Sequence, residues 1–184
     1  MTNLSNLTKA MIERAQALGA DVVKASASLS EVREFNVDGG KFSLFRTLFN
    51  RSASITVFKG GKKGAASINR FDDESIEGLI RDALAAADSA QPDEAWDLCH
   101  EAYEYDITDG APECDVETLF ARTKELKDTI NQDYPKVLIE QMIVDHTGCD
   151  SVYADTSDNL YTDESGSYNV SLMFSGHEGE KASS

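Results

Sequence analysis

The stretch that decides the fold class is Phe35–Ser67, which reads FNVDGGKFSLFRTLFNRSASITVFKGGKKGAAS. Apolar and polar side chains alternate along it, and alternation with period two puts one set on each face of a β-sheet. The pairs Gly39-Gly40 and Gly60-Gly61 interrupt the alternation, and glycine readily adopts the positive φ that a tight hairpin turn requires. The stretch therefore predicts an antiparallel meander of about three or four strands, each near the usual ~5–6 residues.

One competing interpretation concerns the aromatic residues of this stretch. Phe42, Phe45 and Phe49 are three or four positions apart, which is also the spacing of a helical stripe. A helix here would shorten the meander.

The composition excludes some classes of partner. The 184 residues include 33 acidic and 17 basic ones, so the formal net charge is −16. Nucleic acid and anionic membranes would repel such a chain, so neither is expected as a partner. There is no apolar run of the ~20 residues that a membrane span needs, and the N-terminus has no apolar signal-peptide core. Cys99, Cys114 and Cys149 are odd in number and widely spaced, so we expect reduced thiols and a cytoplasmic protein.

Three segments show helical periodicity. Apolar residues recur at three- and four-residue spacing from Leu4 to Leu18, after a capping residue at Asn3 or Ser5. Asp72 is a natural N-cap for a second helix that ends near Ala90, and Asp115 caps a third that ends before Pro135. Together with the meander, these helices predict an α+β fold, with three helices packed on a mostly antiparallel sheet.

The order of these elements suggests two related units. Residues 21–29 alternate as a strand before the meander, and residues 136–145, 151–154, 159–162 and 168–174 predict further short strands with a bulge or bend at Thr147-Gly148. The predicted division is 1–91 as a first helix, meander and helix unit, 92–114 as an acidic linker, and 115–184 as a second helix and meander unit. The second unit lacks a closing helix, so we expect a truncated chain.

Three segments resemble the TldD/PmbA family. They are GADVVKASAS near the start, ITVFKGGKKGAASINRFDDESIEGLIRDALAAA, and KVLIEQMIVDHTGCDSVYADTSDNLYTDESGSYNVSLMF. The resemblance covers most of residues 10 to 180 and rests on the order and pattern of elements, without a catalytic signature. It implies that the chain is the N-terminal portion of such a protein.

The resemblance carries expectations about function. Family members are zinc metallopeptidases and inactive paralogues, historically called modulators of DNA gyrase. It implies a peptide substrate that is unfolded and enters a closed cavity, and a homodimer or a heterodimer with a paralogous subunit. The zinc ligands of the family lie on an HExxxH helix further along than this chain reaches, with a later Cys. The resemblance therefore gives no catalytic, cofactor-binding or metal-binding residue in this chain, and zinc is expected in the missing C-terminal part.

The histidines agree with that expectation. His100, His146 and His177 each lack a second histidine three to five residues away, the spacing that places two zinc ligands on one helix face. His177-Glu178 begins like a zinc-peptidase motif, but Gly179 follows, and the segment is predicted to be a hairpin turn.

Four other groups of residues have a structural interpretation that we prefer. Asp72-Asp73-Glu74 fits a helix cap better than a cation site. Asp155, Asp158 and Asp163 lack the spacing of a calcium loop and fit a solvated turn. Residues 60–64, GGKKG, lead into a strand, which a phosphate-binding loop does not. Cys99-His100 are adjacent, which rarely lets a nucleophile and a base face each other.

Three functions from different classes remain open. The chain is the scaffold, cavity wall and dimer surface of a TldD/PmbA-type peptidase, or it comes from an inactive partner subunit, or it is an independent α+β interaction module. An HExxxH motif encoded downstream separates the first two.

Overall fold

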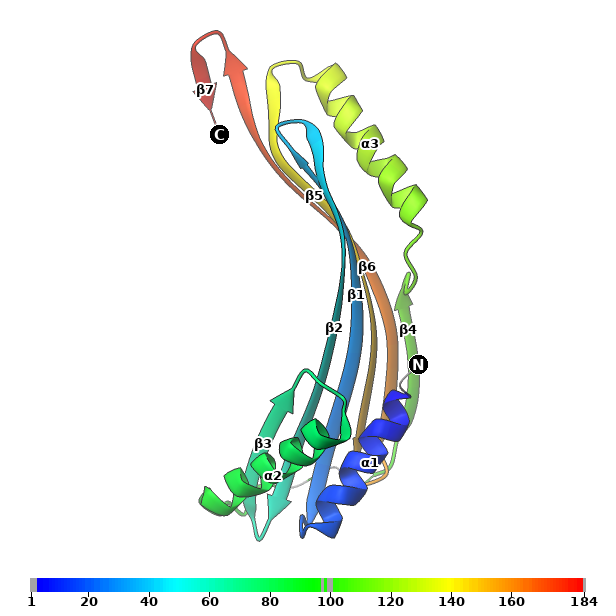
Figure 1. Ribbon diagram of the computed structural model, residues 1–184, viewed down its shortest axis with the longest axis vertical. Helices are drawn as coiled ribbons and strands as arrows, with labels where there is room; N and C mark the ends of the chain where they lie inside the picture. Colours follow the sequence, from blue (N-terminus) through cyan, green and yellow to red (C-terminus); the bar gives the residue numbers. More distant parts are fainter. Residues whose placement is uncertain (1–2, 97, 99–100, 184) are drawn as a thin grey trace. The chain divides into compact units, whose positions relative to one another are not determined.

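The computed structural model describes residues 3–96, 98 and 101–183 (Figure 1). Within these residues it contains three α-helices and seven β-strands, which confirms the α+β class. In chain order the elements are α1 (Leu4–Ala17), β1 (Val22–Asp38), β2 (Lys41–Lys59), β3 (Lys62–Ile68), α2 (Asp73–Ser89), β4 (Glu104–Gly110), α3 (Val116–Asp133), β5 (Val137–Asp155), β6 (Leu160–Glu178) and β7 (Lys181–Ser183).

The strands form one sheet in the order β3-β2-β1-β5-β6-β4, and β7 pairs with β6. The predicted meander is β1, β2 and β3, and Phe42, Phe45 and Phe49 lie on β2, so the helical alternative is excluded. In the second hairpin, Lys59 pairs with Lys62 and Ala53 with Ile68. Both hairpin turns agree with the sequence prediction, because the two central glycines of each have positive φ, between 55° and 74°.

The predicted strand lengths were wrong. Strands β2, β5 and β6 each have 19 residues and β1 has 17, about three times the expected length. Polar residues such as Arg51 and Ser52 lie inside β2. The predicted bend at Thr147-Gly148 lies inside β5, and the short strands predicted after it belong to β5 and β6.

The helix starts agree with the sequence. The side chains of Asn3, Asp72 and Asp115 each accept a hydrogen bond from the backbone N–H three residues later, at 3.0 Å. The hydrogen bond from the Ser75 side chain contributes most to lowering the pKa of Asp72, and the bond from the Thr118 backbone does so for Asp115. Asp72-Asp73-Glu74 is thus the start of α2, as predicted.

The described chain divides into two compact units, each assembled from three segments. The first unit contains residues 1–29, 50–108 and 149–164, and the second contains residues 30–49, 109–148 and 165–184. These spatial units do not coincide with the predicted consecutive segments 1–91, 92–114 and 115–184. The division into those segments stays a prediction about repeated sequence units. The expected linker also contains β4, whose seven residues are all exposed.

Each unit has its own core. In the first unit, α1 and α2 pack on alternate residues of the strands, among them Val23, Ile55 and Val152. In the second unit, Leu119 and Ile130 of α3 pack against Phe35, Val37 and neighbouring residues of β5. Figure 1 shows α1 and α2 beside the strands of the first unit and α3 beside those of the second.

The connection from β4 to α3 crosses two strands in the second unit. The N–H of Ala111 donates to the carbonyl of Gly166 on β6, at 3.2 Å. A Cβ at Gly166 would lie 1.7 Å from the Ala111 carbonyl oxygen, and one at Gly148 on β5 would lie 2.4 Å from that of Pro112. Both positions therefore require glycine, because the crossing chain occupies the place of a side chain.

Gly64→Ala on β3 should strongly destabilise the first unit. A Cβ there would lie 2.0 Å from the carbonyl oxygen of Ala83 and 2.3 Å from the nitrogen of Ala87, both in the backbone of α2. We expect a loss of at least ~3 kcal/mol in the free energy of unfolding, measured by urea denaturation. Gly78→Ala within α2 is the control, since a Cβ there meets nothing within 4 Å. This substitution should raise the free energy of unfolding by about 0.5–1 kcal/mol, because alanine favours a helix interior more than glycine does. Equal effects of the two substitutions would contradict the close packing of β3 on α2.

Candidate functional site

The sheet of the first unit has one face that the two helices do not cover. Because side chains alternate, the residues between the core positions of β1 and β2 point to this face, and several are serines. Ser26 on β1 and Ser54 on β2 are joined by a hydrogen bond between their hydroxyls at 2.8 Å. Serine side chains are short, so this part of the open face presents hydroxyl groups close to the sheet.

Four tyrosines continue this face across β4, β6 and β5. Their rings stack in sequence, from Tyr103 to Tyr105 at 6.0 Å, then to Tyr161 at 5.6 Å and to Tyr153 at 5.5 Å between ring centroids. We call this set the tyrosine ladder. Stacked aromatic rings present a rigid surface with hydroxyl groups at its rim, a composition that suits binding of another chain.

A shallow hollow of about 320 Å³ lies where the serines and the ladder meet. Ile107, Tyr153 and Tyr161 supply its apolar wall, and Asp163 adds one carboxylate. Four serines also line it: Ser26, Ser28, Ser52 and Ser151. The hollow is open to solvent and has the width of a few side chains rather than of a folded partner.

At the other end of the same unit, Trp96 covers part of the open face. Its ring lies 6.0 Å from that of Phe58 on β2, and the ammonium of Lys63 lies 4.3 Å from the centroid of the Trp96 ring. The N–H of Asp93 donates to Gly61 O at 2.9 Å and fixes this segment to the second hairpin. The segment GGKKG is therefore a hairpin that anchors another piece of chain, in agreement with the sequence interpretation.

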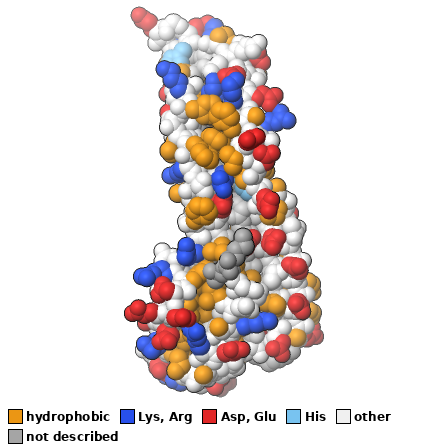
Figure 2. Space-filling view, turned by 45° about the vertical axis from the view of Figure 1, so that its right-hand side comes forward, with side chains coloured by type: hydrophobic (Ala, Val, Ile, Leu, Met, Phe, Trp, Pro, Cys, Tyr) orange, Lys and Arg blue, Asp and Glu red, His pale blue; other side chains and the backbone are white. Residues whose placement is uncertain are grey.

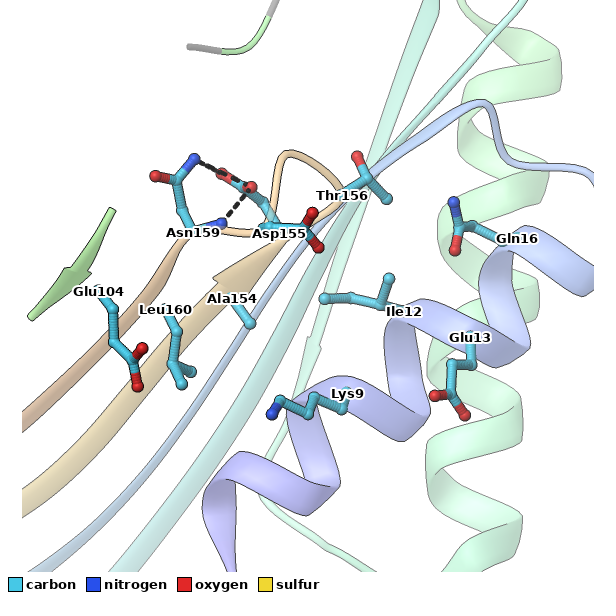
Figure 3. A pocket seen from close by; sticks show the side chains of 11 residues that line it. Lys9, Ile12, Glu13, Gln16, Glu104, Ala154, Asp155, Thr156, Asn159 and Leu160 are labelled. Atoms are coloured by element: carbon cyan, nitrogen blue, oxygen red, sulfur yellow. Dashed lines mark hydrogen bonds between the residues drawn. The ribbon is translucent and has the colours of Figure 1, made fainter. Parts of the chain in front are cut away.

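A larger hollow of about 590 Å³ lies between α1 and the turn from β5 to β6 (Figure 3). Lys9, Glu13 and Gln16 line it from α1, and Glu104 of β4 lines it from the strand side. The lining is mixed in charge, and the side chains from α1 are long and flexible. We assign it no ligand.

Asp155 holds the turn that borders this hollow. Its buried carboxylate accepts hydrogen bonds from the backbone N–H of Ser157 at 2.8 Å, from the side chain of Asn159 at 3.2 Å and from the hydroxyl of Tyr153 at 2.8 Å. Burial, and then the bond to Asp155, raise the pKa of Tyr153 above its ordinary value. Asn159 in turn accepts from the N–H of Tyr103 at 2.9 Å, so the same turn fixes one end of the tyrosine ladder.

The second unit exposes apolar side chains on two strands. We call this set the apolar strip, and its two strands are separated in the sheet by β1 and β5: Phe42, Leu44, Phe45, Leu48 and Phe49 on β2, and Tyr168, Val170, Leu172, Met173 and Phe174 on β6. Phe49 is the most exposed, at 70%. Figure 2 shows hydrophobic side chains gathered on the visible face among charged ones.

The histidines and cysteines do not form a site in the described residues. His146 is buried, donates from Nε2 to Ala111 O at 2.6 Å and packs on Tyr168. His177 lies near the end of β6, and Gly179 has φ of 61° in the following turn, which confirms the hairpin prediction. Cys114 and Cys149 are free thiols, and burial raises the pKa of each. The pair Cys99-His100 lies outside the described residues.

The structure separates the three predicted acids of the turn region. Asp155 accepts hydrogen bonds within the turn, Asp158 lines the larger hollow, and Asp163 lines the smaller one on the opposite face. No group of three His, Cys, Asp or Glu side chains with metal-binding geometry occurs in the described part of the chain. Among the helices that the structure describes, none combines the length and apolarity needed to cross a membrane.

Sequence reasoning missed the tyrosine ladder. Tyr103 and Tyr105 have the period of a strand, and they lie in the segment that we interpreted as an aperiodic linker. Tyr161 lies on β6, which pairs with β4, and Tyr153 lies on β5, the next strand of the sheet. Both are about 50 residues further along the chain. The two-residue spacing was therefore a usable signal for β4, but its partners required the topology.

Comparison with known proteins identifies related folds. Residues 25–87 match the family model described as PmbA/TldA metallopeptidase domain 1. Over 96% of the chain, the fold is similar to that of TldE from Thermococcus kodakarensis, with a TM-score of 0.79 and 16% identity. It is also similar to candidate modulators of DNA gyrase from Bacteroides thetaiotaomicron (TM-score 0.75, 12% identity, 97% of the chain) and Thermotoga maritima (0.65, 13%, 96%).

The chain corresponds to part of these structures. It covers 40%, 42% and 40% of the three solved chains, in the order given. Among curated proteins, none matches the chain significantly by sequence. The resemblance seen in the sequence, to the N-terminal portion of this family, is confirmed.

Asp155→Ala should destabilise the protein by about 2–4 kcal/mol, because it leaves several buried donors without an acceptor. Asp155→Asn keeps one oxygen and the shape of the side chain, so it should cost less. Urea unfolding of both variants measures the difference. A loss below 1 kcal/mol for Asp155→Ala would show that the turn does not depend on this carboxylate.

Proposed function

We propose, from the premise that this chain carries domain 1 of the TldD/PmbA family in residues 25–87, that it is the substrate-cavity and subunit-contact part of a zinc-dependent peptidase that acts on unfolded peptides. The parent protein would be longer than the chain, as the solved relatives are.

The observation that carries the proposal is the open face of the first unit. An unfolded peptide offers backbone amides and side chains in an extended form, and it needs a long surface rather than a deep pocket. The serine positions give polar contacts close to the sheet, and the tyrosine ladder gives an aromatic surface beside a hollow of about 320 Å³. Neither element selects one particular sequence, which suits a substrate class defined by being unfolded.

The zinc would be bound outside this chain. Among the described residues, no three His, Cys, Asp or Glu side chains are grouped so that they could hold a metal ion, and His146 already contacts Ala111 and Tyr168. The proposal therefore assigns to these residues the holding of the peptide and assigns the hydrolysis to the remainder of the parent.

The apolar strip of the second unit supports a subunit contact. Large exposed Phe, Leu and Met side chains on two strands are typical of the centre of an interface. We assign this surface to a homodimer or to a heterodimer with a paralogous subunit. If the parent lacks zinc ligands, the same surface makes it the inactive partner subunit, which is the second candidate function.

Peptide hydrolysis by the full-length parent tests the function. We expect it to cleave an unfolded peptide, to lose activity after zinc is removed with a chelator, and to regain it on addition of Zn²⁺. Tyr105→Ser removes an aromatic ring that is 52% exposed on β4, so it should raise KM about 3- to 10-fold and leave kcat unchanged. Tyr134→Ser, at the C-terminal end of α3, is the control and should change neither constant.

Two outcomes would contradict this assignment. If the zinc-loaded parent hydrolyses no unfolded peptide, alone or with a paralogous subunit, then the peptidase function is wrong. If Tyr105→Ser and Tyr134→Ser have the same KM as the unchanged enzyme, then the open face does not hold the substrate.

Phe49→Asp should dissociate the dimer while the fold remains intact. It places a charge at the most exposed aromatic residue of the apolar strip, where burial in an interface would be costly. Leu18→Asp, at the end of α1, introduces the same charge at another exposed apolar residue and should leave the dimer unchanged. Analytical ultracentrifugation gives the oligomeric state and circular dichroism gives the fold. A monomeric unchanged protein would contradict the assignment.

A further inference from the structure

Three buried side-chain oxygens in the second unit lack a hydrogen-bond donor within the described structure. They are Glu34 Oε1, Asn36 Oδ1 and Asp145 Oδ2. Buried polar atoms normally have a partner, because an unpaired one loses its hydration without compensation. All three are acceptors, so whatever satisfies them must bring positive charge or donors.

The three oxygens belong to neighbouring positions of one sheet face. Strands β1 and β5 are adjacent in the sheet, and the N–H of Gly39 donates to Glu140 O at 3.1 Å. Antiparallel pairing that continues from this bond sets Glu34 opposite Asp145, with Asn36 two residues further along β1. Directly opposite side chains have Cβ atoms about 4.5–5.5 Å apart, so the two carboxyl groups can reach a common point.

The same register explains which face they occupy. It sets Val37 opposite Met142 and Phe35 opposite Val144, and all four of these residues belong to the core under α3. Glu34, Asn36 and Asp145 alternate with them and therefore point to the other face. His146, the nearest histidine in the sequence, has the parity of the core residues and lies on the α3 side.

The charge at this place is incompletely balanced. The side chain of Glu34 is only 8% exposed, and its Oε2 accepts from Arg46 Nη2 at 2.9 Å, while Oε1 is left over. Two carboxylates thus face one guanidinium among the described residues. Like charges directly opposite each other on a sheet repel, and burial strengthens that repulsion.

We propose that Glu34, Asn36 and Asp145 bind a hard divalent cation, Ca²⁺ or Mg²⁺. The donor atoms are two carboxylate oxygens and one amide oxygen, the ligand type that these ions prefer. Nitrogen and sulfur ligands are absent from the set, so Zn²⁺ is not its natural ion. Water would fill the remaining coordination positions. This site is independent of the peptidase proposal and of any zinc elsewhere in the parent.

Titration of the full-length protein tests this site. The protein is stripped with a chelator, then CaCl₂ or MgCl₂ alone is added and followed by calorimetry and by thermal unfolding. We expect saturable binding of one ion per chain and a rise in Tm. At a cation concentration one hundred times Kd, the folded state should gain about a hundredfold in its equilibrium with the unfolded state.

Three variants separate a bound cation from a general salt effect. Asp145→Asn should raise the Tm of the stripped protein, because it removes the repulsion, and should weaken cation binding at least tenfold. Asn36→Asp should have the opposite effects: it should lower the Tm of the stripped protein and should make cation binding tighter. Asp150→Asn removes the same charge from an exposed position of β5 and should leave binding unchanged. A cation response that is absent from the unchanged protein, or is the same in Asp145→Asn, would overturn the proposal.

Discussion

The close passage of the chain over β5 and β6 is the constraint on which the second unit depends. Between β4 and α3, the backbone at Ala111 and Pro112 lies so near Gly166 and Gly148 that neither position has space for a Cβ. The hydrogen bonds of Ala111 to Gly166 and to His146 fix this crossing. Because α3 begins only a few residues later, at Val116, the crossing determines where the helix meets its strands.

That constraint also explains the buried histidine. His146 projects from β5 two residues before Gly148, and the missing side chain at Gly148 leaves the passing carbonyl of Ala111 within reach of Nε2. The histidine is thus a structural hydrogen-bond donor, and Tyr168 closes the other side of its ring. A catalytic or metal-binding use of the ring would compete with both contacts.

The features that depend on short stretches of sequence could be predicted. Asp72 and Asp115 cap their helices, and the glycine pairs make the hairpin turns, because each of these depends on a few adjacent residues. Strand length could not be predicted from the same evidence. A strand whose outer face is solvated can continue through polar residues such as those near Arg51. Its true length is visible only from its pairing with the neighbouring strands.

The candidate site depended even more on topology. Tyr105 and Tyr161 are stacked although 56 residues separate them, and their contact follows from β4 adding to the edge of the sheet at β6. Likewise, nothing in the sequence around Glu34 indicates Asp145, because the two residues become neighbours only when β1 and β5 pair. The exposed surfaces consist mainly of Ser, Tyr and Phe residues, which occur throughout the chain and carry no motif, whereas the reactive side chain of His177 does not contribute to them.

The strand order has a consequence for biosynthesis. Strand β1 lies between β2 and β5, and roughly 100 residues of chain separate its end from the start of β5. At ~5–20 residues per second, a ribosome delivers β5 about 5–20 seconds after β1. During that interval the hairpin has an unpaired edge along β1. Such an intermediate is a natural client for a chaperone that shields strand edges, and a low expression temperature, which slows aggregation, would favour recovery of the folded protein.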